Sequence, residues 1–353
     1  MALFPPQDRL PSDDPAAALL GETDHRADAF LGTPRVLAIA GTGQNGATLL
    51  CRLAGALPGT FAVGEIGHLW NKGLVEDVAC SCGAPFRRCE FWSEVGEVAF
   101  GGWRRLELDH VLALRARLTL NGRKMAHPFA LPLISHPSLS RSYTRDLQEY
   151  TDLMIQVYLA VHHVSGAELI VDSMKIPAHV YMLQAVPGID VSILHLVRDP
   201  RGVAFSRTKK IERQGSLADR PLRTQWSPAR TASKWTWFNL AFEALRRRAP
   251  DFARMRYEDL VVDPRRALHD ACESLALDVD VASLPIEGHE ATLEPGHLVA
   301  GNRMRNERGV IRIRQDDAWR TQLGARSRRT VELMTSPLRS RYGYAAAGPD
   351  SGD

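Results

Sequence analysis

The chain has 353 residues, a formal net charge of +3, and contents of 44% hydrophobic and 24% charged residues. This composition is typical of a folded globular protein with room for one large α/β domain, and the near-balanced charge gives no indication of nucleic-acid binding. No apolar run reaches the roughly 18–20 residues of a membrane span, so we expect no membrane association. Five cysteines, an odd number in a large chain, argue against a secreted disulfide framework and predict a cytoplasmic location.

Residues 1–33 begin MALFPPQDRLPSDDP, which lacks the basic start and apolar core of a signal peptide. We expect residues 1–33 to form a flexible arm and residues 345–353 a flexible tail. Residues 34–344 are expected to form a single α/β domain. Its segment at about 70–142, rich in Trp, Gly, Arg and Pro, is predicted to be an insertion of short helices and loops. Within it, 127–137 is interrupted by proline and cannot be one helix.

The first elements form a βαβ unit. Val36–Ala40 is a continuous apolar run, as expected of a strand buried on both faces. A helix over Ala47–Leu57 is ended by Pro58-Gly59, and Phe61–Val63 is a second strand. Further helices are predicted at 145–164, 178–185, 229–248 and 264–275, and further strands at 168–172, 191–197 and 252–257. This alternation predicts a P-loop-type, mostly parallel sheet flanked by helices on both faces.

A glycine-rich turn, GTGQNGAT at Gly41–Thr48, joins the first strand to the first helix. Such a turn offers backbone N–H groups to an anion, and the helix that follows points its positive end at it. The spacing fits G-x-x-x-x-G-K-[ST] except that Ala47 stands in place of the lysine. The loop therefore predicts a phosphate site without the cation that handles a γ-phosphate. A nucleotide kinase or P-loop hydrolase stays as a less favoured alternative, with Asp172 as the candidate magnesium ligand.

Three further strand ends carry polar or titratable residues. Glu65 follows the second strand, Asp172–Lys175 (DSMK) the third and Arg198–Ser206 the fourth. Ligands of parallel α/β sheets bind at the carboxyl ends of the strands. We therefore expect these residues to gather with the glycine-rich loop at one edge of the sheet.

These motifs resemble those of sulfotransferases that use 3′-phosphoadenosine 5′-phosphosulfate (PAPS), especially a bacterial branch close to the tyrosylprotein and carbohydrate enzymes. The likeness runs from about residue 35 to 344. It is carried by Gly41–Leu50, by LHLVRDPRGVAFSR at Leu194–Arg207, and by HLVAGNRMRNERGVIRIRQDDAW at His297–Trp319. RYEDL at Arg256–Leu260 and CSCGAPFRRCEFW at Cys80–Trp92 are also similar to this branch.

The resemblance implies transfer of a sulfuryl group from PAPS to a hydroxyl, or an amine, of a small-molecule or glycan acceptor. The products would be a sulfate ester and adenosine 3′,5′-bisphosphate, and the chemistry would need no metal. Glu65 is implied as the base for the acceptor proton, and Lys175 as the cation that neutralises the leaving 5′-phosphate. The residues implied in PAPS binding are Gly41, Thr42, Gly43, Gln44, Asn45, Gly46, Ala47, Thr48, Ser173, Arg198, Ser206, Arg303 and Arg305. Nothing in the sequence specifies the acceptor or the oligomeric state.

One departure concerns Gln44-Asn45, where the family usually has Arg-Ser or Lys-Ser. Loss of a charged contact to the leaving group costs on the order of 1.5–3 kcal/mol, which is one to two decades in rate. A weakly active or non-catalytic nucleotide-binding homologue is therefore a second alternative.

Three cysteines have the spacing Cys80-x-Cys82-x6-Cys89. They lack a fourth ligand for zinc, although His68 lies upstream, and structural zinc sites usually have paired C-x2-C units. We therefore expect no metal, and instead a thiol cluster or a disulfide formed on oxidation.

Overall fold

The computed structural model describes residues 33–118, 140–184, 188–209 and 225–344. The expected arm (apart from Thr33), the expected tail and the proline-interrupted stretch 127–137 lie outside these ranges. Contacts divide the chain into Met1–Thr33 and a larger unit, Pro34–Asp353. All that follows concerns the larger unit.

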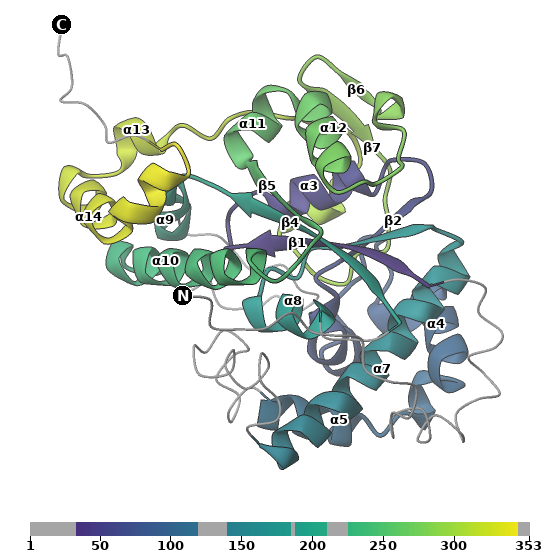
Figure 1. Ribbon diagram of the computed structural model, residues 1–353. Helices are drawn as coiled ribbons and strands as arrows, with labels where there is room; N and C mark the ends of the chain where they lie inside the picture. The colour runs from purple at the N-terminus through teal and green to yellow at the C-terminus, as the bar shows by residue number, and fades with distance from the viewer. Residues whose placement is uncertain (1–32, 119–139, 185–187, 210–224, 345–353) are drawn as a thin grey trace, which may run out of the picture. The chain divides into compact units, whose positions relative to one another are not determined.

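A five-stranded parallel sheet occupies the centre of this unit, in the strand order β2-β3-β1-β4-β5 (Figure 1). The strands are β1 (Arg35–Gly41), β2 (Thr60–Gly64), β3 (Leu169–Asp172), β4 (Asp190–Val197) and β5 (Phe252–Arg256). Every pairing in the sheet is parallel, which confirms the predicted fold class. The strand β3 lies between β1 and β2, so the first βαβ unit does not join adjacent strands.

Helices cover both faces of the sheet (Figure 1). Val36, Ala38 and Ala40 of β1 belong to a core cluster shared with α7 (Arg141–Ser165), α8 (Pro177–Gln184) and α10 (Pro228–Arg246). The alternate residues Leu37 and Ile39 belong to a second cluster, shared with α3 (Ala47–Ala54) and α12 (Pro264–Ser274). Successive side chains of a strand point to opposite faces, and here both faces are buried, which explains the uninterrupted apolar run.

The described residues between β2 and α7 form short helical segments. They pack together with α7 in the first core cluster. The segments are η1 (Ile66–His68), the π-helix η2 (Leu69–Val75), η3 (Phe86–Arg88), α4 (Glu90–Phe100), η4 (Trp103–Arg105) and α5 (Leu108–Leu118).

The C-terminal part adds elements that the sequence did not predict. A small antiparallel sheet has the order β6-β7-β8, and α14 packs against α9 and α10. The remaining elements are α9 (Pro200–Thr208), α11 (Tyr257–Val262), η6 (Val281–Ser283), β6 (Ile286–Glu287), β7 (Glu290–Leu293), η7 (Arg303–Asn306), β8 (Gly309–Arg312), α13 (Trp319–Gln322) and α14 (Ala325–Arg341). Among the described residues, no helix combines the length and the apolar character needed to cross a membrane.

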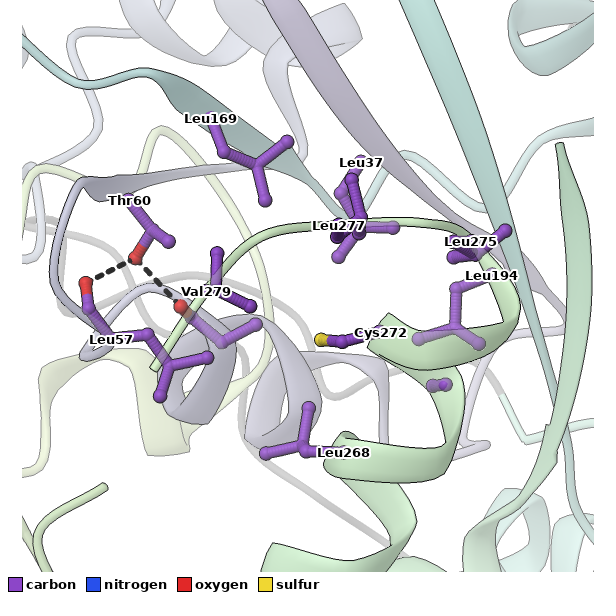
Figure 2. Close-up of a pocket in the computed structure, with 12 residues that line it drawn as sticks. Leu37, Leu57, Thr60, Leu169, Leu194, Leu268, Cys272, Leu275, Leu277 and Val279 are labelled. Atoms are coloured by element: carbon purple, nitrogen blue, oxygen red, sulfur yellow. Dashed lines mark hydrogen bonds between the residues drawn. The ribbon is translucent and has the colours of Figure 1, made fainter. Parts of the chain in front are cut away.

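A small apolar space lies within the core between α3, α12 and the sheet (Figure 2). Thr60 is the polar residue of its lining, and its hydroxyl donates to the carbonyls of Ala54 and Leu57, at 2.7 Å each. Ligand pockets place a few polar groups where they meet the ligand. Because the hydroxyl is already bonded to the surrounding backbone, this space is a gap in the packing, and it lies away from the carboxyl ends of the strands.

Candidate functional site

The glycine-rich loop meets the segment that follows β4. Arg198 donates through Nη1 to the carbonyl oxygen of Gln44 at 3.0 Å, and Ser206 donates through Oγ to Oε1 of the same Gln44 at 2.9 Å. The contact arises because β1 and β4 are adjacent parallel strands whose carboxyl ends lie at one edge. The structure therefore brings together two groups of residues that the sequence singled out separately.

Asn45 fixes the shape of this loop. Its side chain is buried, donates to the carbonyl of Leu196 at 2.8 Å, and accepts the N–H of Ala47 at 3.2 Å. The loop turns through left-handed backbone at Gln44 (φ 74°) and Gly46 (φ 94°). Both polar atoms of the Asn45 side chain are thus bonded to backbone groups, which fixes the conformation of the loop before the start of α3.

The start of α3 carries the features of an anion site. Gly46 is the N-cap and supplies no side-chain cap. The N–H groups of Thr48 and Leu49 lie in the first turn, where no intrahelical acceptor exists, and the positive end of the helix dipole adds to them. Thr42 and Thr48 are buried here, and Thr48 Oγ1 accepts the N–H of Asn302 at 3.4 Å.

Arg198 lies in a setting of several charges. It is buried, with its guanidinium carbon 4.4 Å from the ring centre of Tyr257. Its Nη2 is 3.3 Å from a carboxylate oxygen of Asp316, and Lys209 Nζ lies 3.4 Å from the same oxygen. Trp235 donates to the carbonyl of Arg198 at 3.0 Å, which fixes the backbone. Two cations therefore share one carboxylate beside the loop, an arrangement that favours a further anion.

Glu65 and Lys175 form an ion pair across the ends of β2 and β3. Lys175 also donates to the carbonyl of Ser173 at 3.2 Å, and His68 Nε2 lies 3.4 Å from the second oxygen of Glu65. Burial by itself would raise the pKa of Glu65, but the Lys175 ammonium and His68 together hold that pKa well below its usual range. Glu65 is therefore an ionised carboxylate at neutral pH.

Asp172 shapes the turn that presents Lys175. Its buried carboxylate accepts the hydroxyl of Tyr158 and the Nε2 of His179, both at 2.8 Å, and the N–H of Met174 at 2.8 Å. A magnesium ligand needs an oxygen open to the metal. Because its oxygens are bonded to three protein groups, Asp172 is not available as the magnesium ligand that a kinase or hydrolase would need.

The two C-terminal arginines differ in placement. Arg305 is buried, and it donates to the carbonyls of Leu298 at 3.2 Å, Val299 at 2.7 Å and Ala79 at 2.9 Å. These bonds direct its guanidinium toward backbone carbonyls, so Arg305 connects the chain near Leu298 to the chain near Ala79. Arg303 is exposed. Of the two, Arg303 is therefore the one whose charge is accessible to a ligand.

Two residues beside the loop were not singled out by the sequence. A Cβ placed on Gly43 would lie 2.4 Å from Nη2 of Arg207, and one placed on Gly46 would lie 2.4 Å from the ring of Tyr257. Both belong to motifs that the sequence shows, since Arg207 ends LHLVRDPRGVAFSR and Tyr257 is the tyrosine of RYEDL. Their contact with the loop depends on the order of the strands in the sheet, which the sequence does not specify.

RYEDL lies at the junction of β5 and α11, next to the start of α9. Glu258 lies in the first turn of α11, and it accepts the N–H of Asp199 at 3.1 Å and the hydroxyl of Tyr344 at 2.6 Å. Asp199 in turn caps α9 by accepting the N–H of Arg201 at 2.8 Å. These bonds hold the turn that carries Arg198.

Comparison with known proteins gives one sequence match. Residues 97–281, slightly more than half of the chain, match the sequence model of the Sulfotransferase family. This range contains Lys175, Arg198 and Ser206. No curated protein is significantly similar to the chain in sequence.

Several solved structures are similar at low identity. The sulfotransferase domain of the Synechococcus PCC 7002 olefin synthase has 19% identity and a TM-score of 0.44, with 92% of this chain and 98% of that chain covered. The sulfotransferase domain from the curacin biosynthetic pathway has 17% identity and a TM-score of 0.44, with coverages of 90% and 100%. Sulfotransferase STF9 from Mycobacterium avium has 12% identity and a TM-score of 0.42, with coverages of 94% and 82%.

Proposed function

The chain belongs to the sulfotransferase family, and on that premise we propose that it transfers a sulfuryl group from PAPS to a hydroxyl of a small-molecule or glycan acceptor. One observation carries the proposal. At a single edge of the sheet, a loop with unsatisfied N–H groups lies next to a buried arginine and an ion pair of carboxylate and ammonium. PAPS has two anionic ends and needs both a base and a cation at the reacting centre, and this edge supplies each of them.

The anionic ends of the donor have separate partners in this proposal. The N–H groups at the start of α3, with Thr42 and Thr48, would hold the 5′-phosphosulfate. Arg198 and Ser206 would hold the 3′-phosphate. Asp316 is the present partner of Arg198 and Lys209, so a bound phosphate would replace or displace its carboxylate.

The reaction would use the Glu65–Lys175 pair as follows. The acceptor oxygen forms a bond to sulfur while the bond between sulfur and the bridging oxygen of the donor breaks, and the acceptor proton passes to Glu65. Lys175 stabilises the negative charge that develops on the leaving 5′-phosphate. As Lys175 turns from Glu65 to the leaving group, the pKa of Glu65 rises, which makes the carboxylate a better base when the proton is transferred.

The uncharged Gln44 sets the expected efficiency. Its side-chain oxygen accepts a hydrogen bond from Ser206, which connects the glycine-rich loop to α9. The family usually has a cation at this position. Arg207, whose guanidinium lies against Gly43, is the residue best placed to supply the missing charge. A weakly active or non-catalytic nucleotide-binding homologue remains the second candidate because of Gln44.

Calorimetry and an acceptor screen test the proposal together. We expect tight binding of adenosine 3′,5′-bisphosphate in the absence of Mg²⁺ and transfer of labelled sulfate from PAPS to at least one hydroxyl acceptor. Arg198→Ala should weaken bisphosphate binding, while Arg312→Ala, in an exposed ion pair on β8, should not. Binding of ATP–Mg²⁺ without binding of the bisphosphate would refute the proposal. Bisphosphate binding without transfer to any acceptor would favour the non-catalytic candidate.

The cytoplasmic location stays a prediction from the cysteine content.

A further inference from the structure

Four potential metal ligands meet outside the proposed reaction centre. The Sγ atoms of Cys80, Cys82 and Cys89 and a ring nitrogen of His297 all lie within 4.8 Å of one another. The sequence showed the three cysteines without a fourth ligand. His297 supplies it, from a position 208 residues beyond Cys89. His68, the upstream alternative, lies beside Glu65 instead.

The spacing of these atoms fits a tetrahedral zinc ion. Two thiolate sulfurs on one tetrahedral zinc, each at about 2.3 Å, lie about 3.8 Å apart, and a sulfur and a nitrogen lie slightly closer. Here Cys82 Sγ and Cys89 Sγ are 3.7 Å apart, and His297 Nδ1 is 3.2 Å from Cys89 Sγ and 3.8 Å from Cys80 Sγ. We propose that Cys80, Cys82, Cys89 and His297 bind one structural zinc ion, which departs from the expectation of no metal.

A disulfide explains the cluster less well. A disulfide bond brings two sulfurs to about 2.05 Å, whereas the Cys82 and Cys89 sulfurs are 3.7 Å apart. A disulfide would also use two of the thiols and give no reason for the convergence of a third thiol and an imidazole. Four ligands with no open position are typical of structural zinc, because catalytic zinc keeps one position for water or substrate.

The protein around the cluster orients its ligands. The ring of His297 stacks on Phe91, with ring centres 4.9 Å apart, and Trp92 donates to the carbonyl of His297 at 2.8 Å. Cys80 and Cys89 are both 1% exposed. The tight turn after Cys80 is closed by a bond from the N–H of Gly83 to the carbonyl of Cys80 at 2.9 Å, with Gly83 at φ 102°. Such outer contacts are usual where histidine and cysteine bind a metal.

The ion would connect the insertion to the segment that borders the reaction centre. Beyond His297, the N–H of Val299 donates to the carbonyl of Val63 at 3.0 Å, and the N–H of Glu65 donates to the carbonyl of Ala300 at 3.3 Å. Asn302 then reaches Thr48 of the loop. A zinc ion at His297 would thus fix a segment that touches both Glu65 and the anion site, without itself taking part in the reaction.

Elemental analysis of the full chain, free of any polyhistidine tag, tests the proposal. We expect one zinc ion per chain in the purified protein, and loss of zinc in Cys89→Ser and His297→Ala. Cys272→Ala is the matched control, since Cys272 is also a buried free thiol but lies on α12 outside the cluster, and it should keep its zinc. Full zinc content in Cys89→Ser or His297→Ala would overturn the proposal.

Cobalt substitution of the wild-type chain avoids dependence on the folding of the variants. After removal of the metal, addition of Co²⁺ alone should produce the visible bands of tetrahedral cobalt and the near-ultraviolet band of cobalt–thiolate bonds. His297→Cys should still bind Co²⁺, with shifted bands, because a fourth thiolate replaces the imidazole. Absence of these bands in the wild type, or a disulfide between two of the three cysteines in freshly purified protein, would refute the site.

Discussion

Lys175 donates a hydrogen bond to the carboxylate of Glu65, so the proposed base and the proposed cation neutralise each other in this structure. The pair has a consequence for pH dependence. The folded-state pKa of Glu65 lies below its ordinary value of 4.5, so its contribution to stability is fully present above that value. The contribution is lost as the pH falls through the lower, folded-state pKa.

Lys175→Met should therefore change the dependence of kcat/KM on pH in the acid range. Without the ammonium, burial is the dominant influence and the pKa of Glu65 rises. We expect the acid limb of kcat/KM to move to higher pH than in the wild type, together with a lower plateau. The melting temperature of the variant should fall more at pH 7 than at pH 3, because the contribution of the wild-type pair is complete at pH 7 and already reduced below the ordinary pKa of the carboxyl. An acid limb at the same pH in both proteins would contradict the assignment.

Glu65→Gln should remove the base and leave nucleotide binding in place. A positioned general base contributes typically 10²–10⁴-fold, and we expect kcat to fall by roughly that factor. Calorimetry should give an unchanged affinity for adenosine 3′,5′-bisphosphate. Glu76→Gln, paired with Lys72 on the helical turns after Glu65, is the control and should keep full turnover. Full turnover in Glu65→Gln would exclude Glu65 as the base.

Asp316 competes with phosphate for Arg198 and Lys209 in the proposed site. Asp316→Asn should therefore tighten bisphosphate binding, by a few-fold for a partly exposed pair of about 0.5–1 kcal/mol. Arg198→Ala should weaken binding by roughly 10- to 150-fold, the equivalent of a lost charged hydrogen bond. Asp317→Asn, at the adjacent position and paired with Arg320, is the matched control. Weaker binding in Asp316→Asn would show that the carboxylate positions Arg198 rather than competing with the ligand.

Gln44→Lys tests whether the missing cation limits the reaction. A charge restored at this position should raise turnover with PAPS by one to two decades if no other group compensates. Arg207→Ala in the wild-type background should lower turnover if Arg207 is the compensating cation. The double variant Gln44→Lys/Arg207→Ala should then recover the activity that Arg207→Ala loses. Steady-state rates of the wild type, the two single variants and the double variant test both ideas. Equal turnover in all four proteins would exclude a rate limit at Gln44 and compensation by Arg207.

Much of the sheet was predictable because its strands are uninterrupted apolar runs such as Val36–Ala40. The strands β6, β7 and β8 were missed because they have only two to four residues each, and because β8 pairs with β7 across an intervening segment. The helix α14 was missed because Pro337 interrupts its pattern. These elements depend on tertiary packing, which overrides weak local signals.

The candidate site was predictable where residues follow strand ends, because the order of a parallel sheet brings those ends together. Its side-chain directions were not predictable. No local pattern distinguishes Arg305, which is directed into backbone carbonyls, from Arg303, which is exposed. The approach of His297 to the three cysteines was not predictable either, because 208 residues separate it from Cys89.

The contacts of the segment after His297 also determine when the site can assemble during synthesis. Domains fold as the chain emerges from its N-terminus, at about 5–20 residues per second. Thr48 and the backbone N–H of Glu65 emerge early, but their partners Asn302 and Ala300 follow 254 and 235 residues later. The nascent chain therefore carries an incomplete reaction centre for on the order of 10–50 seconds, until its last part has folded back onto its beginning.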